Sequence, residues 1–396
     1  MLKISTAVLA LASASSLAAA THDIAPGDGA QERLQEALIL AEPGDEIVLA
    51  EGRYVLTDGL SLDVDGVTVR GAGMDASVLD FTTQQGAGEG LLVTSDNVTL
   101  RDFAVENAKG DGIKSKGADQ IIYHSVRVEW TNGPDATNGA YGIYPVEASN
   151  VLVQDSFVRG ASDAGIYVGQ SEDIIVRRNR VVENVAGIEI ENSNRAEVTE
   201  NLATKNTGGI LVFDLPGLPK VGGGQVLVAR NAVIDNNTDN FAPEGNIVAS
   251  VPAGTGVMVM ANKGVQVLDN ALVNNDTSHV MLIAYTQSFD DERYEPRPVD
   301  VVVRGNVYGS GGAAPDFEGG AFLAAAFGGA LPPVLTDGLH QNLAVEDAVP
   351  VVSLGLSEVG QPFTQAQPQL VQPVIAGETV ALAPVALPAE MEARLK

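Results

Sequence analysis

A short internal repeat organises most of this 396-residue sequence. A glycine followed by an aliphatic residue recurs at spacings of 22, 30, 23, 22, 22 and 47 residues. These glycines are Gly90, Gly112, Gly142, Gly165, Gly187, Gly209 and Gly256. A unit of about 22 residues cannot bury an apolar face by itself, so successive units have to stack on one another. The repeat therefore predicts a solenoid.

The composition of each repeat favours strands over helices. Short runs of β-branched and aliphatic residues recur once per repeat, for example at 121–123, 151–153 and 174–176. Helical repeats are longer, at about 33 to 47 residues, and follow a 3.6-residue period that this sequence lacks. The 43 glycines and the aromatic content of only 5% fit short strands joined by tight turns around an aliphatic core. We therefore predict an all-β fold.

Two series of asparagines share the register of the repeat. The first comprises Asn179, Asn201, Asn231, Asn270 and Asn306, and the second comprises Asn184, Asn206, Asn236 and Asn275. A side-chain amide repeated at the strand spacing of about 4.8 Å can donate to one neighbour and accept from the other. We interpret both series as structural ladders inside turns rather than as ligands of a bound molecule.

These aliphatic stacks and asparagine ladders resemble the right-handed parallel β-helix of the pectate-lyase-like superfamily, over about residues 46 to 306. The predicted fold is thus a right-handed parallel β-helix with coils of 22–23 residues. A helical apolar spacing at 30–41 predicts a short N-terminal capping helix. Motifs such as GDGIKSKG (110–117), GASDAGIYVGQS (160–171) and ENVAGIEIENS (183–193) are similar to an uncharacterised bacterial family of exported β-helix repeat proteins.

That second resemblance implies export, often together with another exported protein, and brings no established activity. The Asp-Pro-His-Asp pattern of alginate epimerases is absent from the sequence, as is the Gly-His-Gly pattern of polygalacturonases. Residues 1–20 read as a cleaved signal peptide, with one lysine, an apolar stretch and a small-residue end at Ala20. We therefore expect a periplasmic or secreted protein.

The predicted organisation is a single solenoid with capped ends. Residues 1–20 form the signal peptide, 21–45 the N-terminal cap, 46–310 the β-helix, and 311–396 a last coil and a covering tail. No disulfide can staple this fold, because the chain has no cysteine.

The charge of the chain excludes several partners. It has 51 Asp and Glu residues against 23 Lys and Arg residues, a formal charge of −28. Nucleic acids and anionic membrane surfaces are bound through clustered basic residues, so neither is a predicted partner. A polyanionic polysaccharide would also be repelled unless calcium or Lys114, Lys116 and Lys220 offset the field.

Side chains that follow each Gly-Ile pair should alternate between the core and the outer surface of one sheet. Two outward columns result, the first with Lys114, Tyr144, Tyr167, Glu189, Leu211 and Met258, and the second with Lys116, Val146, Gly169, Glu191, Phe213 and Met260. One half of this surface is polar and the other is apolar. Insertions at 131–141 and 214–224 are expected to wall a groove over the polar half.

We predict that a polysaccharide or oligosaccharide binds in this groove. The candidate catalytic residues are Glu189, Tyr167 and Lys114, and the candidate substrate-binding residues are Tyr141, Tyr144, Asp163, Glu191 and Asp214. Glu189 and Glu191 lie two residues apart on a strand, about 6.5 Å between Cα atoms, which suits the carboxyl pair of a hydrolase or a calcium site. In a lyase or epimerase, Lys114 or Tyr167 would be the base and a tyrosine the acid. The alternative is that these are ordinary solvated side chains.

The apolar half of the surface needs a cover. Leu211, Phe213, Met258 and Met260 would otherwise form a patch large enough to promote association. Either the insertion at 237–255 and the C-terminal segment cover this patch, or a second exported protein docks on it. In the second case the protein would be a non-enzymatic interaction module.

Overall fold

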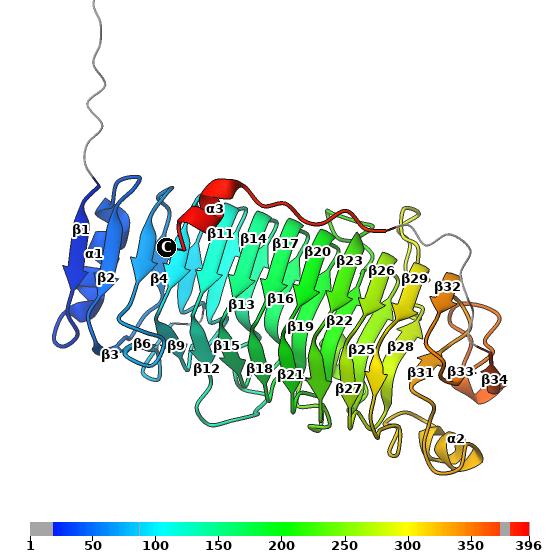
Figure 1. Cartoon of the computed structure of the whole chain (residues 1–396). Coiled ribbons are helices and arrows are strands. Elements are labelled where there is room, and N and C mark those ends of the chain that lie inside the picture. The colour runs from blue at the N-terminus through cyan, green and yellow to red at the C-terminus, as the bar shows by residue number, and fades with distance from the viewer. Residues whose placement is uncertain (1–18, 87, 373–380, 396) are drawn as a thin grey trace, which may run out of the picture.

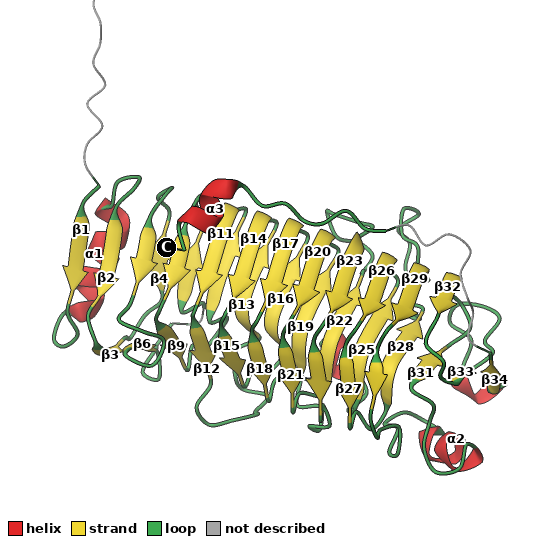
Figure 2. Ribbon diagram, viewed as in Figure 1, coloured by secondary structure: helices red, strands yellow, loops and turns green. Residues whose placement is uncertain are grey.

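The computed structural model describes residues 19–86, 88–372 and 381–395. Three long sheets of parallel strands run the length of the molecule, and the chain visits them in turn, coil after coil (Figures 1 and 2). This is the predicted parallel β-helix. Residues 1–18, which hold most of the predicted signal peptide, lie outside the described residues.

We call the three sheets A, B and C. Sheet A contains β1 (Thr21–Ile24), β2 (Glu46–Leu49), β5 (Thr68–Arg70), β8 (Thr99–Arg101), β11 (Asp119–His124), β14 (Ser149–Gln154), β17 (Glu172–Arg177), β20 (Asn194–Thr199), β23 (Gly224–Ala229), β26 (Lys263–Leu268), β29 (Val299–Arg304) and β32 (Gln341–Val345). Sheet B contains β3 (Gly52–Val55), β6 (Ser77–Asp80), β9 (Ala104–Glu106), β12 (Arg127–Glu129), β15 (Phe157–Arg159), β18 (Arg180–Val182), β21 (Leu202–Thr204), β24 (Ala232–Ile234), β27 (Ala271–Val273) and β30 (Val307–Tyr308).

Sheet C carries the predicted groove. Its strands are β4 (Leu60–Leu62), β7 (Leu91–Val93), β10 (Ile113–Lys116), β13 (Tyr141–Val146), β16 (Ala164–Gly169), β19 (Ala186–Glu191), β22 (Gly208–Phe213), β25 (Thr255–Met260), β28 (Ser278–Ile283), β31 (Val334–Thr336), β33 (Val351–Ser353) and β34 (Gln369–Val371). All its pairings are parallel except that of β33 with β34.

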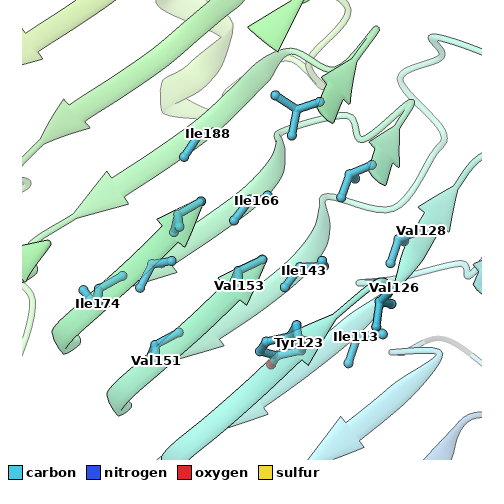
Figure 3. Packing of buried hydrophobic residues seen from close by; sticks show 14 of the residues in the cluster. Ile113, Tyr123, Val126, Val128, Ile143, Val151, Val153, Ile166, Ile174 and Ile188 are labelled. Atoms are coloured by element: carbon cyan, nitrogen blue, oxygen red, sulfur yellow. The ribbon is translucent and has the colours of Figure 1, made fainter. Parts of the chain in front are cut away.

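The core is a stack of aliphatic side chains between the three sheets. Ile113, Ile143, Ile166 and Ile188 lie opposite one another in register on successive strands of sheet C, and all are fully buried (Figure 3). They pack against equivalent stacks from sheets A and B, such as Val151 on β14. Burying an aliphatic side chain stabilises the fold by about 1.5 to 3 kcal/mol, so a continuous stack needs no cross-link.

The glycine of each Gly-Ile pair faces the same core. A Cβ atom built on Gly112 would lie 2.3 Å from Val128, and one on Gly142 would lie 2.3 Å from Val158. Ile113 and Ile143, the residues that follow these glycines, are also in the core. Two successive positions therefore face inward at the start of each strand of sheet C, and strict alternation fails there.

The asparagine ladders have the predicted structural role. Asn206 accepts at Oδ1 from the backbone N–H of Asn184 at 3.0 Å and from its Nδ2 at 3.0 Å. It donates from Nδ2 to Asn236 Oδ1 at 2.9 Å and to Val181 O at 3.2 Å. The residue before it, Lys205, is in the left-handed region at a φ of 56°. A one-residue bend thus turns each asparagine inward, where the ladder satisfies the buried polar groups.

Both ends of the stack are covered. The predicted N-terminal helix is confirmed as α1 (Ala30–Leu40), which buries Leu34 and Leu38 against the first coil. After β30 come α2 (Gly320–Ala326), the last strands, and a tail that ends in α3 (Ala389–Ala393). The short helices η1 (Ile247–Ser250) and η2 (Phe363–Gln365) lie in loops. No helix of the described chain is long and apolar enough to cross a membrane.

The C-terminal tail returns along sheet A to the first half of the solenoid (Figure 1). Met391 is fully buried against Ile122, Leu152 and Ile175. Arg177 forms an ion pair with Glu392 at 2.9 Å. The segment 381–395 of the predicted covering tail therefore covers sheet A, whereas Ala366, earlier in the same tail, packs on the apolar half of sheet C.

We expect Asn206→Ala to lower the free energy of unfolding by about 2 to 4 kcal/mol, because it removes the acceptor of two buried N–H groups of Asn184 and the amide donor to Val181 O. Chemical denaturation measures this change. The matched control is Asn132→Ala, at an exposed loop position. Equal stability of the two variants would show that the ladder does not hold the coils together.

Candidate functional site

The outer face of sheet C changes abruptly from polar to apolar between β19 and β22. In the strand register, Tyr167 lies opposite Glu189, and Glu189 lies opposite Leu211. Glu191 lies opposite Phe213 in the same way. The structure therefore confirms that both outward columns are in the predicted register.

In the polar half, Tyr167, Glu189 and Glu191 are buried, which contradicts the alternative interpretation of ordinary solvated side chains, whereas Lys116 is exposed. Leu211, Phe213, Met258 and Met260 are all buried under loops of the same chain. Val248 and Val251, from the loop that precedes β25, pack on them as predicted. Residues after β30 complete the cover, among them Leu335, Leu339, Val352 and Leu354. This face is therefore not available for docking a second protein.

One predicted wall of the groove was wrong. Most of the insertion at 131–141 lies on the side of sheet B, where Asn132 and Pro134 border a depression together with Lys205. Its stem is tied there because Asn138 Nδ2 donates to Gly160 O at 2.6 Å. Only its end, at Ala140 and Tyr141, reaches the site over sheet C. The loop has no apolar side chain long enough to hold it across the sheet.

The wall is instead formed by the loop that precedes β25. Residues Asn246 to Pro252 and Leu215 enclose a cavity of about 340 Å³ over β13, β16, β19, β22 and β25. One end is lined by Tyr141, Asp163, Glu189 and Glu191, and the other by apolar side chains such as Met258. The volume is at the lower end of small-molecule sites, so it suits a short segment of a ligand.

Three buried carboxyl groups define the polar end of this cavity. Asp163, Glu189 and Glu191 are 8%, 2% and 8% exposed. Among the described residues, no lysine or arginine forms an ion pair with any of the three, and Glu189 Oε1 has no hydrogen-bond partner at all. Burial without a counter-cation disfavours the ionised form of each group.

The pKa values follow from this environment. Burial raises the pKa of Asp163 to about 7, although a hydrogen bond from Tyr141 opposes the change. Burial likewise raises the pKa of Glu191 to about 7, against the effect of a hydrogen bond from Tyr167. The pKa of Glu189 is raised well above its usual value by burial and by the charges of Asp163 and Glu191.

The three tyrosines form one cluster beside the carboxyl groups. The ring centroids of Tyr141, Tyr144 and Tyr167 lie 4.5 to 4.8 Å from one another. Tyr167 is only 4% exposed, and its ring lies over Gly169, where a Cβ would come within 2.3 Å of it. Burial raises the pKa of all three hydroxyls, so they act as hydrogen-bond donors rather than as bases.

Four of the eight candidate residues do not line the cavity, namely Tyr144 and Tyr167 of the tyrosine cluster, Lys114 and Asp214. Lys114 Nζ is 3.2 Å from Glu89 and 3.5 Å from Asp111, and it lies over the ring of Tyr144. Asp214 closes the loop 214–224, since it accepts from Gly223 N at 2.6 Å and from Asn262 Nδ2 at 2.8 Å. Burial raises the pKa of Asp214 to about 6, but the side chain is occupied by these contacts.

Sequence reasoning missed Asp111 and the wall of the cavity. Burial raises the pKa of Asp111 to about 6. If side chains alternated strictly before Ile113, Asp111 would face the core. Gly112 and Ile113 both face the core, however, so the inward–outward alternation is shifted by one residue at Asp111. The recurrence of glycine at the position of Gly112 was the sequence signal that this position faces the core. Val248 and Val251 lie in the insertion at 237–255, which was predicted to cover the apolar half and not to wall the groove.

The possible calcium site has no support from geometry. Among the described residues, no three or more carboxylate or histidine side chains are placed so that they could hold a metal ion. Glu189 and Glu191 share one strand, but a Ca²⁺ ion takes six to eight oxygen ligands. The structure thus provides two neighbouring carboxyl groups and no ligand cage around them.

A larger depression, of about 690 Å³, lies over sheet B. Its charged side chains largely neutralise one another, because Arg127 pairs with Glu129 at 2.7 Å and Arg159 pairs with Glu183 at 2.6 Å. Exposed ion pairs of this kind are ordinary surface features. The cavity over sheet C is the better candidate, because its polar groups are buried and unpaired.

Comparisons with known proteins agree on the fold. Residues 65–218 match the family model for a right handed beta helix region. The A-modules of two Azotobacter vinelandii mannuronan C-5 epimerases are similar in structure. AlgE4 is 16% identical with a TM-score of 0.50, covering 82% of this chain and 95% of that one. AlgE6 is 17% identical with a TM-score of 0.52, covering 82% and 93%.

No curated protein matches the chain in sequence. At these low identities, the structural matches establish the architecture alone. The fold is a right-handed parallel β-helix, and the chain is distantly similar in structure to the two epimerase modules.

The raised pKa values predict an unusual pH dependence of stability. A carboxyl group with a higher pKa in the folded state binds its proton more tightly there, so it loses stabilising free energy as the pH rises through about 7. We expect Glu191→Gln to reduce the loss of unfolding free energy between pH 5 and pH 8 by about 2 kcal/mol. Denaturant titrations at the two pH values measure it.

Glu172→Gln is the matched control, because ion pairs with Lys220 and Arg195 lower the pKa of Glu172. The Glu172→Gln variant should lose as much unfolding free energy between pH 5 and pH 8 as the wild-type protein, or more. The same pH response in both variants would contradict the assignment of a raised pKa to Glu191.

Proposed function

We propose that this protein binds a short segment of carbohydrate in the cavity over sheet C and hydrolyses it by acid–base chemistry. The observation that carries the proposal is the set of three buried, unpaired carboxyl groups at one end of a cavity. Tyrosine hydroxyls lie beside them, and an apolar wall lies opposite. Sugars offer hydroxyls to the first surface and C–H faces to the second.

The two glutamates on β19 would divide the proton transfers. Glu189, whose pKa is raised well above its usual value by burial, would donate its proton to the glycosidic oxygen as the C–O bond breaks. Glu191, held toward its ionised form by Tyr167, would take a proton from the water that attacks the sugar carbon. The products are two hydroxyl-terminated fragments, and a proton exchange restores both groups.

The charges favour this reaction over elimination from an acidic polymer. Elimination next to a sugar carboxylate needs a cation that neutralises that carboxylate. The only lysine of the predicted site, Lys114, is engaged with Glu89 and Asp111. A uronate polymer would also meet the field of a chain with a charge of −28. The named relatives are mannuronan epimerases, so the proposed substrate differs from theirs in charge.

The proposal predicts hydrolysis of a glycan without carboxylates, with activity that rises as the pH approaches about 7 and Glu191 ionises while Glu189 keeps its proton. Glu191→Gln should lower the rate at least about 100-fold. A reducing-end assay over a panel of such oligosaccharides measures this, with Glu172→Gln as the control. Retention of full activity by Glu191→Gln would contradict the mechanism, and a panel without a single product or binder would contradict the function.

We also propose that the protein acts outside the cytoplasm, on the support of the pattern in residues 1–20. The first strand, β1, begins at Thr21, directly after the predicted cleavage site. N-terminal sequencing of protein from the periplasm or the medium should begin close to residue 21. An uncleaved chain found in the cytoplasm would contradict export.

A further inference from the structure

The polar end of the sheet C cavity gathers three buried carboxyl groups that form no ion pair with a lysine or arginine of the described chain. Asp163 directly precedes β16, and Glu189 and Glu191 lie on β19, the next strand of the sheet. Adjacent strands are about 4.8 Å apart, so the three groups come from one small area. Each of these side chains is at least nine-tenths buried, and all three line the cavity.

Buried carboxylates are normally neutralised by a basic side chain or a metal ion. Within the described chain, neither is supplied here. The nearest lysine of the sheet, Lys114, is bound to Glu89 and Asp111, and no set of three or more possible metal ligands exists. Glu189 Oε1 is fully buried, lines the cavity and has no hydrogen-bond partner. Its missing partner is therefore a donor that arrives with the ligand.

We propose that the carbohydrate bound in this cavity carries a protonated primary amine, which sits against Asp163, Glu189 and Glu191. The inference rests on the proposed function, since it names the class of sugar that the same cavity takes. An ammonium group has three donors and no acceptor, so it can donate to Glu189 Oε1, which has no partner, and also to the neighbouring carboxyl groups. A charge-assisted hydrogen bond is also stronger than a neutral one.

The rest of the cavity restricts what is attached to the amine. Tyr141 lies beside the carboxyl groups, while Val248, Val251 and Met258 face them from the other end. These apolar groups contact the C–H faces of a sugar ring but offer no partner for a second charge. The ligand is therefore an amino sugar in an oligosaccharide and not a linear polyamine. The negative field of the whole chain steers such a cation toward the site.

Amine binding is linked to proton release. Burial raises the pKa of Asp163 and of Glu191 to about 7, so both are partly protonated at neutral pH. A bound ammonium stabilises the ionised forms, and the site must then release protons. The charge of Asp111 raises the pKa of Asp163 further, and the charges of Asp163 and Asp214 raise that of Glu191. A neutral sugar has no such effect.

The test is calorimetric titration of the full-length mature protein at pH 7 and about 0.15 M salt, which screens binding to the acidic surface. The probes are a glucosamine tetrasaccharide, the matched N-acetylglucosamine tetrasaccharide and spermine. We expect the free amine to bind at least 10-fold more tightly than the acetylated sugar, with proton release that appears as a dependence of the measured heat on the buffer. Glu189→Gln should weaken the amine at least 10-fold, and Glu172→Gln should not.

Each other outcome overturns the inference. Equal or tighter binding of the acetylated sugar would be compatible with the proposed function but would contradict the inference that the ligand carries an amine. Tighter binding of spermine than of the glucosamine tetrasaccharide would contradict the inference that the amine is carried by a sugar. Binding of the amine that Glu189→Gln leaves unchanged would be adsorption to the acidic surface. If neither tetrasaccharide binds, while another glycan of the hydrolysis panel does, the inference of an amino sugar is wrong and the proposed function is not contradicted.

Discussion

The parallel backbone ladder between successive coils sets the position of every functional group in this protein. Each strand hydrogen-bonds to the equivalent strand one repeat later, so equivalent side chains form columns about 4.8 Å apart. Inside the solenoid the columns are isoleucines and valines, in the turns they are asparagines, and on the outer face of sheet C they change from tyrosine to glutamate to leucine. The same geometry that lets asparagines satisfy one another brings carboxyl groups close together.

The carboxyl groups differ from the asparagines in one physical respect. An amide has both a donor and an acceptor, so a column of amides is self-sufficient. Carboxylates repel one another, and their burial under the loop before β25 removes the water that would screen them. The fold therefore holds Asp163, Glu189 and Glu191 in an arrangement that costs stability at neutral pH. Strain of this kind is typical of a site in which a ligand or a reaction supplies the compensation.

The sequence was sufficient for the repeat, the ladders and both outward columns, because each depends on spacing alone. It was also sufficient to place Glu189 and Glu191 on one face of one strand. It misplaced the insertion at 131–141, because the direction of a loop depends on contacts such as that of Asn138 with Gly160 that no periodic pattern encodes. It failed for Asp111 because the inward-facing Gly112 shifts the alternation. It predicted that the insertion at 237–255 and the C-terminal segment would cover the apolar half, but not that the polar side chains beside it would also be buried.

The central claim is that the carboxyl groups over sheet C keep their protons close to neutral pH. Carbon-13 NMR of protein labelled at the side-chain carboxyl groups, followed from pH 4 to pH 9, tests it directly. The account predicts that Glu191 and Asp163 titrate near pH 7 and Glu189 well above its usual range. Titration of all three below about pH 5, as in solvated side chains, would contradict it.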